Sequence, residues 1–429
     1  MAANDLFSFV GDLPVIDWHN HLDMAALAAD APLGSLYSVW VAPDPYKHRA
    51  MRICGVPERL VTGDAPESEK WAAWQNTLPK LVGNPLFDWA KAELSLVRIN
   101  PWPYLRGQGA NVSLAAWTPS RILRAANAEI LSPCVAKDKL SINVHKPRMS
   151  TSANENETAV CDGKFGFVNN CEQLEFLDNF ADGAPHILPS LRLNAGDTVS
   201  EETLERFAAA GCRVVDISVD DTLALCSAPG AKAPGLSPGL SRIAAFAASH
   251  GWTMLLHLGA LRATSSRLRA IAGPAGGFAG MRAPVDPAHV AAFLDALERA
   301  DALPRTILLT LNPEAHAQLA VLSGSFTREV SPGHVQLGPA WWWCDHAHGV
   351  RDVLEKTAAY GVLSTFVGMT TDSRSLLSLA RHDWFRRTLC KWIAGKVASG
   401  DFPDDPALLR PLAEAVCYRN ARRIFAGNR

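Results

Sequence analysis

The sequence predicts an α/β fold, a (β/α)8 barrel of the TIM type, and three observations support this prediction. Eight short apolar runs recur along the chain, and stretches with a helical pattern separate most of them. Several of these runs are almost continuously apolar, which is typical of strands buried on both faces of a parallel sheet. The length of 429 residues suits a single barrel domain that carries insertions.

The predicted strands follow one another at intervals along the chain. They cover residues 15–18, 128–133, 187–192, 213–217, 253–257, 306–311, 335–341 and 365–371. Ser200 is a suitable N-cap for a helix over residues 201–210, whose first turn is acidic. Helical patterns over residues 238–250 and 287–300 continue the alternation of strand and helix.

Two stretches of the chain break this rhythm. Residues 24–125 are too long for one crossover and predict a helical insertion after the first strand. Residues 134–182 are poor in Ala and rich in Asn, Lys, Ser and Glu, which indicates either a flexible surface loop or a local anomaly such as a shifted reading frame. The tail after Ser373 predicts helices. We expect residues 1–429 to form one barrel-like domain.

Composition excludes several classes of protein. The net charge of −2 gives no broad basic field for nucleic acid, and no run approaches the 18 apolar residues of a membrane-spanning helix. The first residues carry Asn4 and Asp5 instead of a basic signal sequence. Nine cysteines, with no Cys-x-x-Cys pair, indicate reduced thiols. We therefore expect a cytoplasmic protein with no nucleic-acid partner and no membrane partner.

The clearest chemical signal is the pair His19 and His21 at the end of the first strand. Residues spaced i, i+2 on a strand point to the same side, so both imidazoles would face one point. Neutral imidazole is a good ligand for zinc and neighbouring metals. The pair therefore predicts half of a divalent metal site.

The active site of a barrel lies at the carboxyl ends of its strands. The residues at these ends are His19, His21, Arg192, His257, Asn312, Trp341, Asp372 and Arg374. Three histidines and one aspartate from strands one, five and eight could converge on one divalent ion and leave a position open for substrate.

Each of these residues also has a structural interpretation. His257 could be a core histidine that bonds to backbone, and Asp372 could be the N-cap of a helix over residues 373–380. Arg192 could pair with a nearby carboxylate. The tryptophans at 341–343 could serve only for packing.

Longer motifs run through most of the chain. Residues 16–22 read Ile-Asp-Trp-His-Asn-His-Leu, and residues 44–63 read DPYKHRAMRICGVPERLVTG. Further motifs lie at residues 83–86, 188–192, 257–262, 306–313, 341–345, 366–387 and 417–425. With these motifs the chain resembles the uronate isomerase family of the amidohydrolase superfamily, whose members carry an Asp-x-His-x-His strand and a DHYKWRAMR-type segment.

The resemblance implies a distorted (β/α)8 barrel with one divalent metal ion, for which zinc is the best fit. It implies an aldose–ketose isomerase whose substrate is a small sugar acid, such as D-glucuronate or D-galacturonate, and a homo-oligomer. By the same resemblance His19, His21 and Asp372 would be metal ligands, and His257 would lie beside them as the fourth member of the metal site.

The resemblance also assigns the substrate-binding and catalytic residues. Arg192, Arg374, Trp341 and Tyr46 would bind the substrate, with the arginine forks on its carboxylate or hydroxyls. Asp372 is the candidate base that moves a proton between C2 and C1 through an enediol, helped by Tyr46 and Arg374.

Three positions depart from the family pattern. Pro45 replaces a His of the DHYKWR-type segment, Cys134 falls where a Thr-Thr-Asp-Asp-Pro motif is usual, and Ile217 replaces the His of Ser-Asp-His-Gly. These changes favour, as an alternative, another metal-dependent enzyme of the superfamily, a hydrolase or a decarboxylase of a small acid. A non-catalytic homologue that binds a sugar acid is a third hypothesis, which the intact His and Asp set disfavours.

Overall fold

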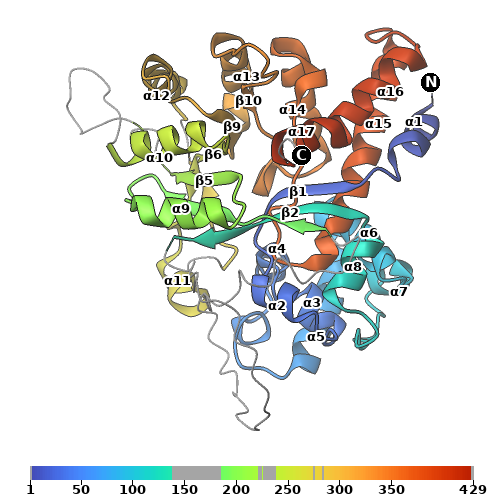
Figure 1. The fold of residues 1–429 in the computed structure, drawn as a ribbon. Coiled ribbons are helices and arrows are strands. Elements are labelled where there is room, and N and C mark those ends of the chain that lie inside the picture. Colours follow the sequence, from blue (N-terminus) through green and yellow to red (C-terminus); the bar gives the residue numbers. More distant parts are fainter. Residues whose placement is uncertain are drawn as a thin grey trace, which may run out of the picture.

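The computed structural model describes residues 2–137, 185–220, 225, 238–273, 276–282 and 285–426. Most of the predicted segment 134–182 lies outside these residues. Within them, a curled parallel sheet is surrounded by helices (Figure 1). The α/β class and the helix-wrapped parallel architecture are therefore confirmed.

The sheet has seven strands on one path, in the order β1-β2-β4-β5-β6-β9-β10, and all neighbours on it are parallel. The bounds are β1 Val15–Asn20, β2 Ala128–Ala136, β4 Ser190–Asn194, β5 Val214–Val219, β6 Thr253–Leu258, β9 Arg305–Thr310 and β10 Val335–Leu337. Three short strands lie off this path, β3 His186–Ile187 beside β2 and the antiparallel pair β7 Ala260–Leu261 and β8 Gly280–Met281.

Seventeen helices are described around the sheet. The α-helices that precede β2 are α1 Ala3–Val10, α2 Met24–Ala29, α3 Leu36–Trp40, α4 Pro45–Ile53, α5 Glu67–Thr77, α6 Pro85–Leu96, α7 Pro101–Leu105 and α8 Pro119–Ala125. Those that follow it are α9 Glu201–Ala209, α10 Pro238–Ser249, α11 Ser266–Ala272, α12 Pro287–Arg299, α13 His316–Ser325, α14 Ala347–Tyr360, α15 Arg381–Ser399, α16 Pro406–Glu414 and α17 Asn420–Phe425. Short turns of other helix types are η1 Glu58–Leu60, η2 Leu78–Leu81, η5 Pro313–Ala315, η6 Trp342–Cys344, η7 Leu363–Thr365, η8 Leu376–Ala380 and η9 Ala415–Arg419.

The predicted eighth strand, residues 365–371, is wrong. Thr365 is the last residue of the 3-10 turn η7, and residues 366–371 form no regular secondary structure. Gly368 has φ +79°, and a Cβ there would lie 2.2 Å from the carbonyl oxygen of Val416. Asp372 also has a positive φ, +48°. The positive φ of Gly368 breaks the extended backbone within residues 365–371, and that of Asp372 follows directly after them.

The irregular segment nevertheless fills the place between the two edge strands. Val367 donates its N–H to the side chain of Gln336 in β10, and Asp372 donates its N–H to the carbonyl of His19 in β1. Asp17 in β1 accepts hydrogen bonds from the hydroxyls of Thr370 and Thr371. The buried carboxylate of Asp17 therefore fixes this segment against the first strand.

Two other predicted strands differ in their bounds because of proline. The run at 187–192 divides into β3 and β4 at Pro189, and the run at 335–341 ends as a strand before Pro339. Proline has no N–H to donate to a neighbouring strand, so it interrupts the ladder.

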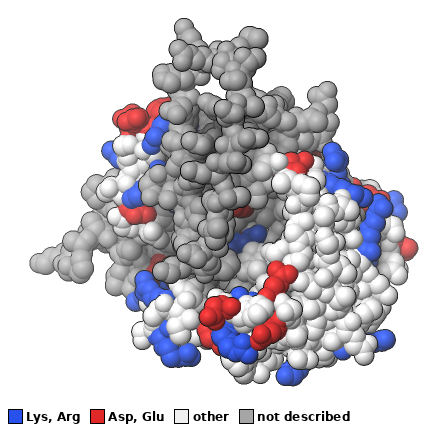
Figure 2. Space-filling model, turned by 90° about the horizontal axis from the view of Figure 1, so that it is seen from below, with Lys and Arg blue, Asp and Glu red and all other residues white. Residues whose placement is uncertain are grey.

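The helices α2–α8 between β1 and β2 gather on one side of the sheet, the lower side in Figure 1, around an apolar cluster of their own. Four of them, α4, α6, α7 and α8, begin with Asp, Asn or Thr followed by Pro. The polar side chain accepts a backbone N–H of the first turn, and Pro is preorganised for the first helical position. Figure 2 shows this side of the molecule, with basic atoms at the bottom of a hollow and acidic and basic side chains mixed at its rim.

No helix among the described residues is both long enough and apolar enough to span a membrane.

Candidate metal centre and active site

His19 and His21 come from the carboxyl end of β1, and both reach the same carboxylate. The Nε2 atoms of His19 and His21 lie 3.1 and 2.9 Å from Oδ1 of Asp372. The His19 side chain is buried, whereas 29% of the His21 side chain is exposed. One ring is therefore enclosed by protein, and the other is open to solvent or to a ligand.

Both carboxylate oxygens of Asp372 have partners, and Oδ1 faces the two histidines. Its Oδ2 accepts a hydrogen bond of 2.7 Å from the indole nitrogen of Trp341. It does not cap a helix, because the next helical turn is η8, whose N-cap is Ser375. The left-handed backbone of Asp372 is uncommon for a residue with a Cβ, and such conformations cluster at functional sites.

His257 lies against the same group from β6. Its ring centroid is 4.7 Å from that of His19 and 4.4 Å from that of Trp341. Its Nδ1 lies 2.6 Å from Oδ1 of Asp216, while its Nε2 is buried with no hydrogen-bond partner among the described residues. A buried polar atom without a partner is costly, so this nitrogen is available to a bound group.

Asp216 and Cys134 are the functional candidates that the sequence interpretation missed. Asp216 on β5 is fully buried, contacts His257 and forms an ion pair with Arg192. The Sγ of Cys134 on β2 lies 3.3 Å from Nδ1 of His19 and 3.4 Å from Oδ2 of Asp216. A carboxylate inside the apolar run of β5 was the available signal for Asp216.

The predicted substrate-binding residues differ in whether their polar atoms already have partners in the protein. Arg192 pairs with Asp216 and with the hydroxyl of Ser218, as its structural interpretation anticipated. The Tyr46 hydroxyl, near the start of α4, is buried without a hydrogen-bond partner in the described structure. The Tyr46 ring packs edge-on against Trp343, with 5.4 Å between centroids. Burial lowers the pKa of the Arg374 guanidinium, and the charge of Asp372 partly offsets that effect.

The three family departures do not cluster. Pro45 is the first residue of α4, where Asp44 caps the backbone N–H of Tyr46. Ile217 is buried in the main apolar core, on the face of β5 opposite to Asp216. Cys134 alone of the three contacts the histidine cluster.

The carboxylates of this cluster are held in the ionised form. Burial raises the pKa of Asp372, but hydrogen bonds and charge from His19 and His21 outweigh burial and leave the pKa well below its usual value. Burial also opposes ionisation of Asp216, and Arg192 and His257 reverse that effect and lower its pKa. Burial lowers the pKa of His257 to about 4, so its imidazole is neutral at pH 7, the form that binds metals.

The donor set fits a divalent metal ion. Two groups of side chains, His19 with His21 and Cys134, and His19 with Asp216 and His257, each present ligand atoms within 4.8 Å of one another. Imidazole, thiolate and carboxylate are the donors that zinc takes in proteins. The unpartnered Nε2 of His257 is the observation that favours a bound ion over a closed hydrogen-bond network.

A sequence model of the glucuronate isomerase family matches residues 1–100 and 237–425. The uronate isomerase of Caldicellulosiruptor saccharolyticus is 31% identical over 97% of this chain and 95% of its own length. That of Serratia proteamaculans is 32% identical over 97% of this chain and 94% of its own.

Solved structures give the same fold. The uronate isomerase from Thermotoga maritima superimposes with a TM-score of 0.77 at 23% identity, covering 99% of this chain and 97% of the other. The glucuronate isomerase from Caulobacter crescentus gives a TM-score of 0.77 at 20% identity, covering 100% of this chain and 94% of the other.

Proposed function

This chain belongs to the glucuronate isomerase family and is a uronate isomerase, and we propose that its reaction takes place at the carboxyl end of the sheet, at the cluster around Asp372. The substrates we propose are D-glucuronate, converted to D-fructuronate, and D-galacturonate, converted to D-tagaturonate. The observation that carries the proposal is the approach of His19 and His21 to one oxygen of Asp372.

We propose that His19, His21, His257 and Asp372 hold one divalent ion, Zn²⁺. The neutral state of His257 and the unpartnered Nε2 on its ring support this assignment. When bound, the ion would act as a Lewis acid on a substrate oxygen.

Anchoring of the sugar acid is assigned to Arg192, Arg374, Trp341 and Tyr46. A hexuronate carries a carboxylate, and guanidinium groups bind carboxylates through two parallel hydrogen bonds. Arg374 is the stronger candidate of the two arginines, because Arg192 already pairs with Asp216. Trp341 orients Asp372 through its indole N–H and offers its ring as a wall.

Isomerisation needs a base that removes the proton from C2 and returns it to C1. Asp372 is ionised and held by Trp341, so it can take that proton while it stays in place. Burial, followed by the charge of Asp372, raises the pKa of Tyr46 well above its usual value. The Tyr46 phenol therefore stays protonated and can donate a hydrogen bond to the oxyanion of the enediol, together with the cation of Arg374.

Proton exchange tests this proposal. Zinc-loaded protein in deuterated water should form the ketose from D-glucuronate or D-galacturonate and exchange the hydrogen at C2, as followed by NMR. The double variant His19→Ala/His21→Ala should do neither. His250→Ala, which changes an exposed histidine at the opposite end of β6, is the matched control and should behave like the parent protein. Loss of CO2 or hydrolysis of a small acid, without ketose formation, would instead identify the hydrolase or decarboxylase alternative.

We propose that the protein is cytoplasmic. The six cysteines in the described part of the chain are free thiols, which supports the reducing cytoplasm. We propose a homo-oligomer, to be tested by the molar mass of the purified protein in solution.

A further inference from the structure

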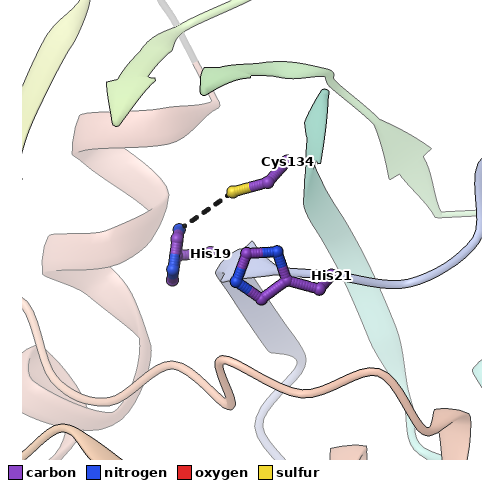
Figure 3. Close-up of side chains that lie close together, drawn as sticks. All are labelled: His19, His21 and Cys134. Carbon is purple, nitrogen blue, oxygen red and sulfur yellow. Dashed lines mark hydrogen bonds between the residues drawn. The ribbon is translucent and has the colours of Figure 1, made fainter. Parts of the chain in front are cut away.

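Cys134 stands at the carboxyl end of β2, immediately beside the histidine pair of β1. Pro133, the residue before it, is paired with Asn20 of β1, so the backbone register brings Cys134 level with the strand end that carries His19 and His21. One ligand atom from each of the three residues lies within 4.8 Å of the other two. Figure 3 shows the thiol of Cys134 turned toward the ring of His19, with His21 beside them.

The contacts of Cys134 differ from those of a packing cysteine. Its sulfur contacts two side chains of the site, Nδ1 of His19 at 3.3 Å and Oδ2 of Asp216 at 3.4 Å. By contrast, the buried thiols of Cys212 and Cys344 contact backbone carbonyl oxygens. The environment of Cys134 is therefore that of a polar ligand, whereas the other two serve the apolar core.

A second observation points to a ligand in the same cluster of side chains. Nε2 of His257 is fully buried and has no partner among the described residues. The His257 ring packs against His19, the residue that Cys134 contacts. His19 belongs to two groups of ligand atoms, one with His21 and Cys134 and one with Asp216 and His257, and the unsatisfied Nε2 of His257 indicates that a bound group completes this cluster.

We propose that Cys134 supplies a thiolate ligand to the divalent ion, which makes this a histidine–cysteine centre that favours zinc. The proposal rests on the proposed metal site and places Cys134 on the ion together with His19 and His21, because His19 faces Cys134 with Nδ1 and Asp372 with Nε2. Metal binding displaces the thiol proton to solvent, because the thiolate is the form that coordinates. Arg192, paired with Asp216, and the ion itself offset the added negative charge.

A thiolate ligand changes the metals that the centre accepts. Sulfur ligands select zinc and other soft ions, whereas sites of imidazole and carboxylate alone also accept Mn²⁺. Even partners that do not touch the metal contribute about 10–100-fold to affinity. Replacing a direct ligand should therefore lower the affinity for zinc about tenfold or more, and it should change the affinity for Mn²⁺ less.

Cobalt spectroscopy of the full chain tests the proposal without relying on activity. The Co²⁺-loaded protein should show a near-ultraviolet thiolate-to-cobalt charge-transfer band. Cys134→Ser and Cys134→Ala should lose the band and bind zinc more weakly. The matched control is Cys54→Ser, which changes a half-buried cysteine at the end of α4. This variant should keep the charge-transfer band and the zinc affinity of the parent protein.

The outcomes separate this proposal from the one it rests on. Cobalt bound with visible d–d absorption but without the sulfur band overturns the Cys134 ligand and leaves the His and Asp site standing. No bound metal overturns both. If the Cys134 variants do not fold, alkylation of the parent protein decides, because zinc should slow the modification of Cys134 and not of Cys54. Equal rates with and without zinc would refute the proposal.

Discussion

Two buried polar clusters in this protein resemble each other in burial and charge but differ in how their atoms are satisfied. The first, which we call the carboxyl-end cluster, contains His19, His21, Cys134, Asp216, His257 and Asp372. The second, which we call the Lys47 cluster, lies in the helical insertion and contains Asp44, Lys47 and Glu93.

The Lys47 cluster is closed. Nζ of Lys47 lies 2.6 Å from Asp44 and 3.2 Å from Glu93. Glu93 also accepts hydrogen bonds from Trp40 and Ser378, and Asp44 caps α4. Its cation is the ammonium group of Lys47, so every charge has a partner within the protein.

The carboxyl-end cluster is open. Its carboxylates face imidazoles, and one nitrogen of His257 has no partner in the described structure. Burial and a shifted pKa occur in both clusters, so neither property identifies the functional site. What distinguishes the site is a set of converging ligand atoms, one of which, Nε2 of His257, has no partner in the described structure.

Removal of the histidine pair should give the largest effect. His19→Ala/His21→Ala should lose the ion and reduce kcat/KM by on the order of 10³-fold or more, because both the electrostatic stabilisation and the donor set disappear. Metal analysis and ketose formation measure the two losses. Retention of the ion in this variant would show that the open cluster is not the metal site.

Substitution in the Lys47 cluster should lower the stability of the protein and leave metal binding intact. Lys47→Met leaves Asp44 and Glu93 buried without their cation and should lower the free energy of unfolding by about 3–5 kcal/mol. Lys91→Met, which breaks an exposed pair with Asp88, should cost less than about 1 kcal/mol. Urea unfolding compares the two, and folded Lys47→Met should still bind zinc. Loss of zinc without loss of stability would reverse our distinction between the clusters.

Acid should weaken the insertion through His48, which lies beside Asp44. Burial lowers the pKa of His48 to about 4, below its ordinary value of 6.5, so the folded state prefers the neutral ring. As pH falls from 6.5 to 4, the unfolded chain gains a proton that the folded chain does not, and stability decreases by roughly 3 kcal/mol.

His48→Gln should flatten this part of the stability curve, since glutamine does not titrate. Urea midpoints at several pH values would measure the slope. The same slope in the variant as in the parent would assign the acid sensitivity to other groups.

Asp216→Asn should give the smallest of these effects. Asp216 orients His257 through Nδ1, and loss of such a partner typically weakens metal affinity about 10–100-fold. Asp352→Asn alters a similar pair with His316 on α13 and is the control. Zinc titration should show a larger Kd for Asp216→Asn and an unchanged Kd for Asp352→Asn. An equal change in both would mean that Asp216 serves packing.

Much of the fold follows from local pattern. Continuous apolar runs located the strands, because a strand covered on both faces leaves little room for polar residues. Local pattern failed at residues 365–371, where the run looks extended but Gly368 has a positive φ and lies so close to the carbonyl of Val416 that a Cβ would clash with it. That restriction comes from a residue far along the chain, so no window of sequence contains it.

Some residues of the candidate site could likewise be predicted from sequence, and others could not. The i, i+2 spacing of His19 and His21 is a local property of β1, and Asp372 follows from its place in a family motif. A carboxylate inside an apolar run marks Asp216 as unusual, but the sequence does not identify Asp216 or Cys134 as partners of His19, because that relation depends on strand order.

The sequence by itself determined the α/β class, the histidine pair and the family, because each is written in short-range periodicity or in long motifs. Only the tertiary structure decided that the thiol of Cys134 lies against His19 and that Nε2 of His257 has no partner among the described residues. The physical reason is that parallel strands bring side chains from distant parts of the chain to one edge, and donor atoms meet there only after the sheet has curled.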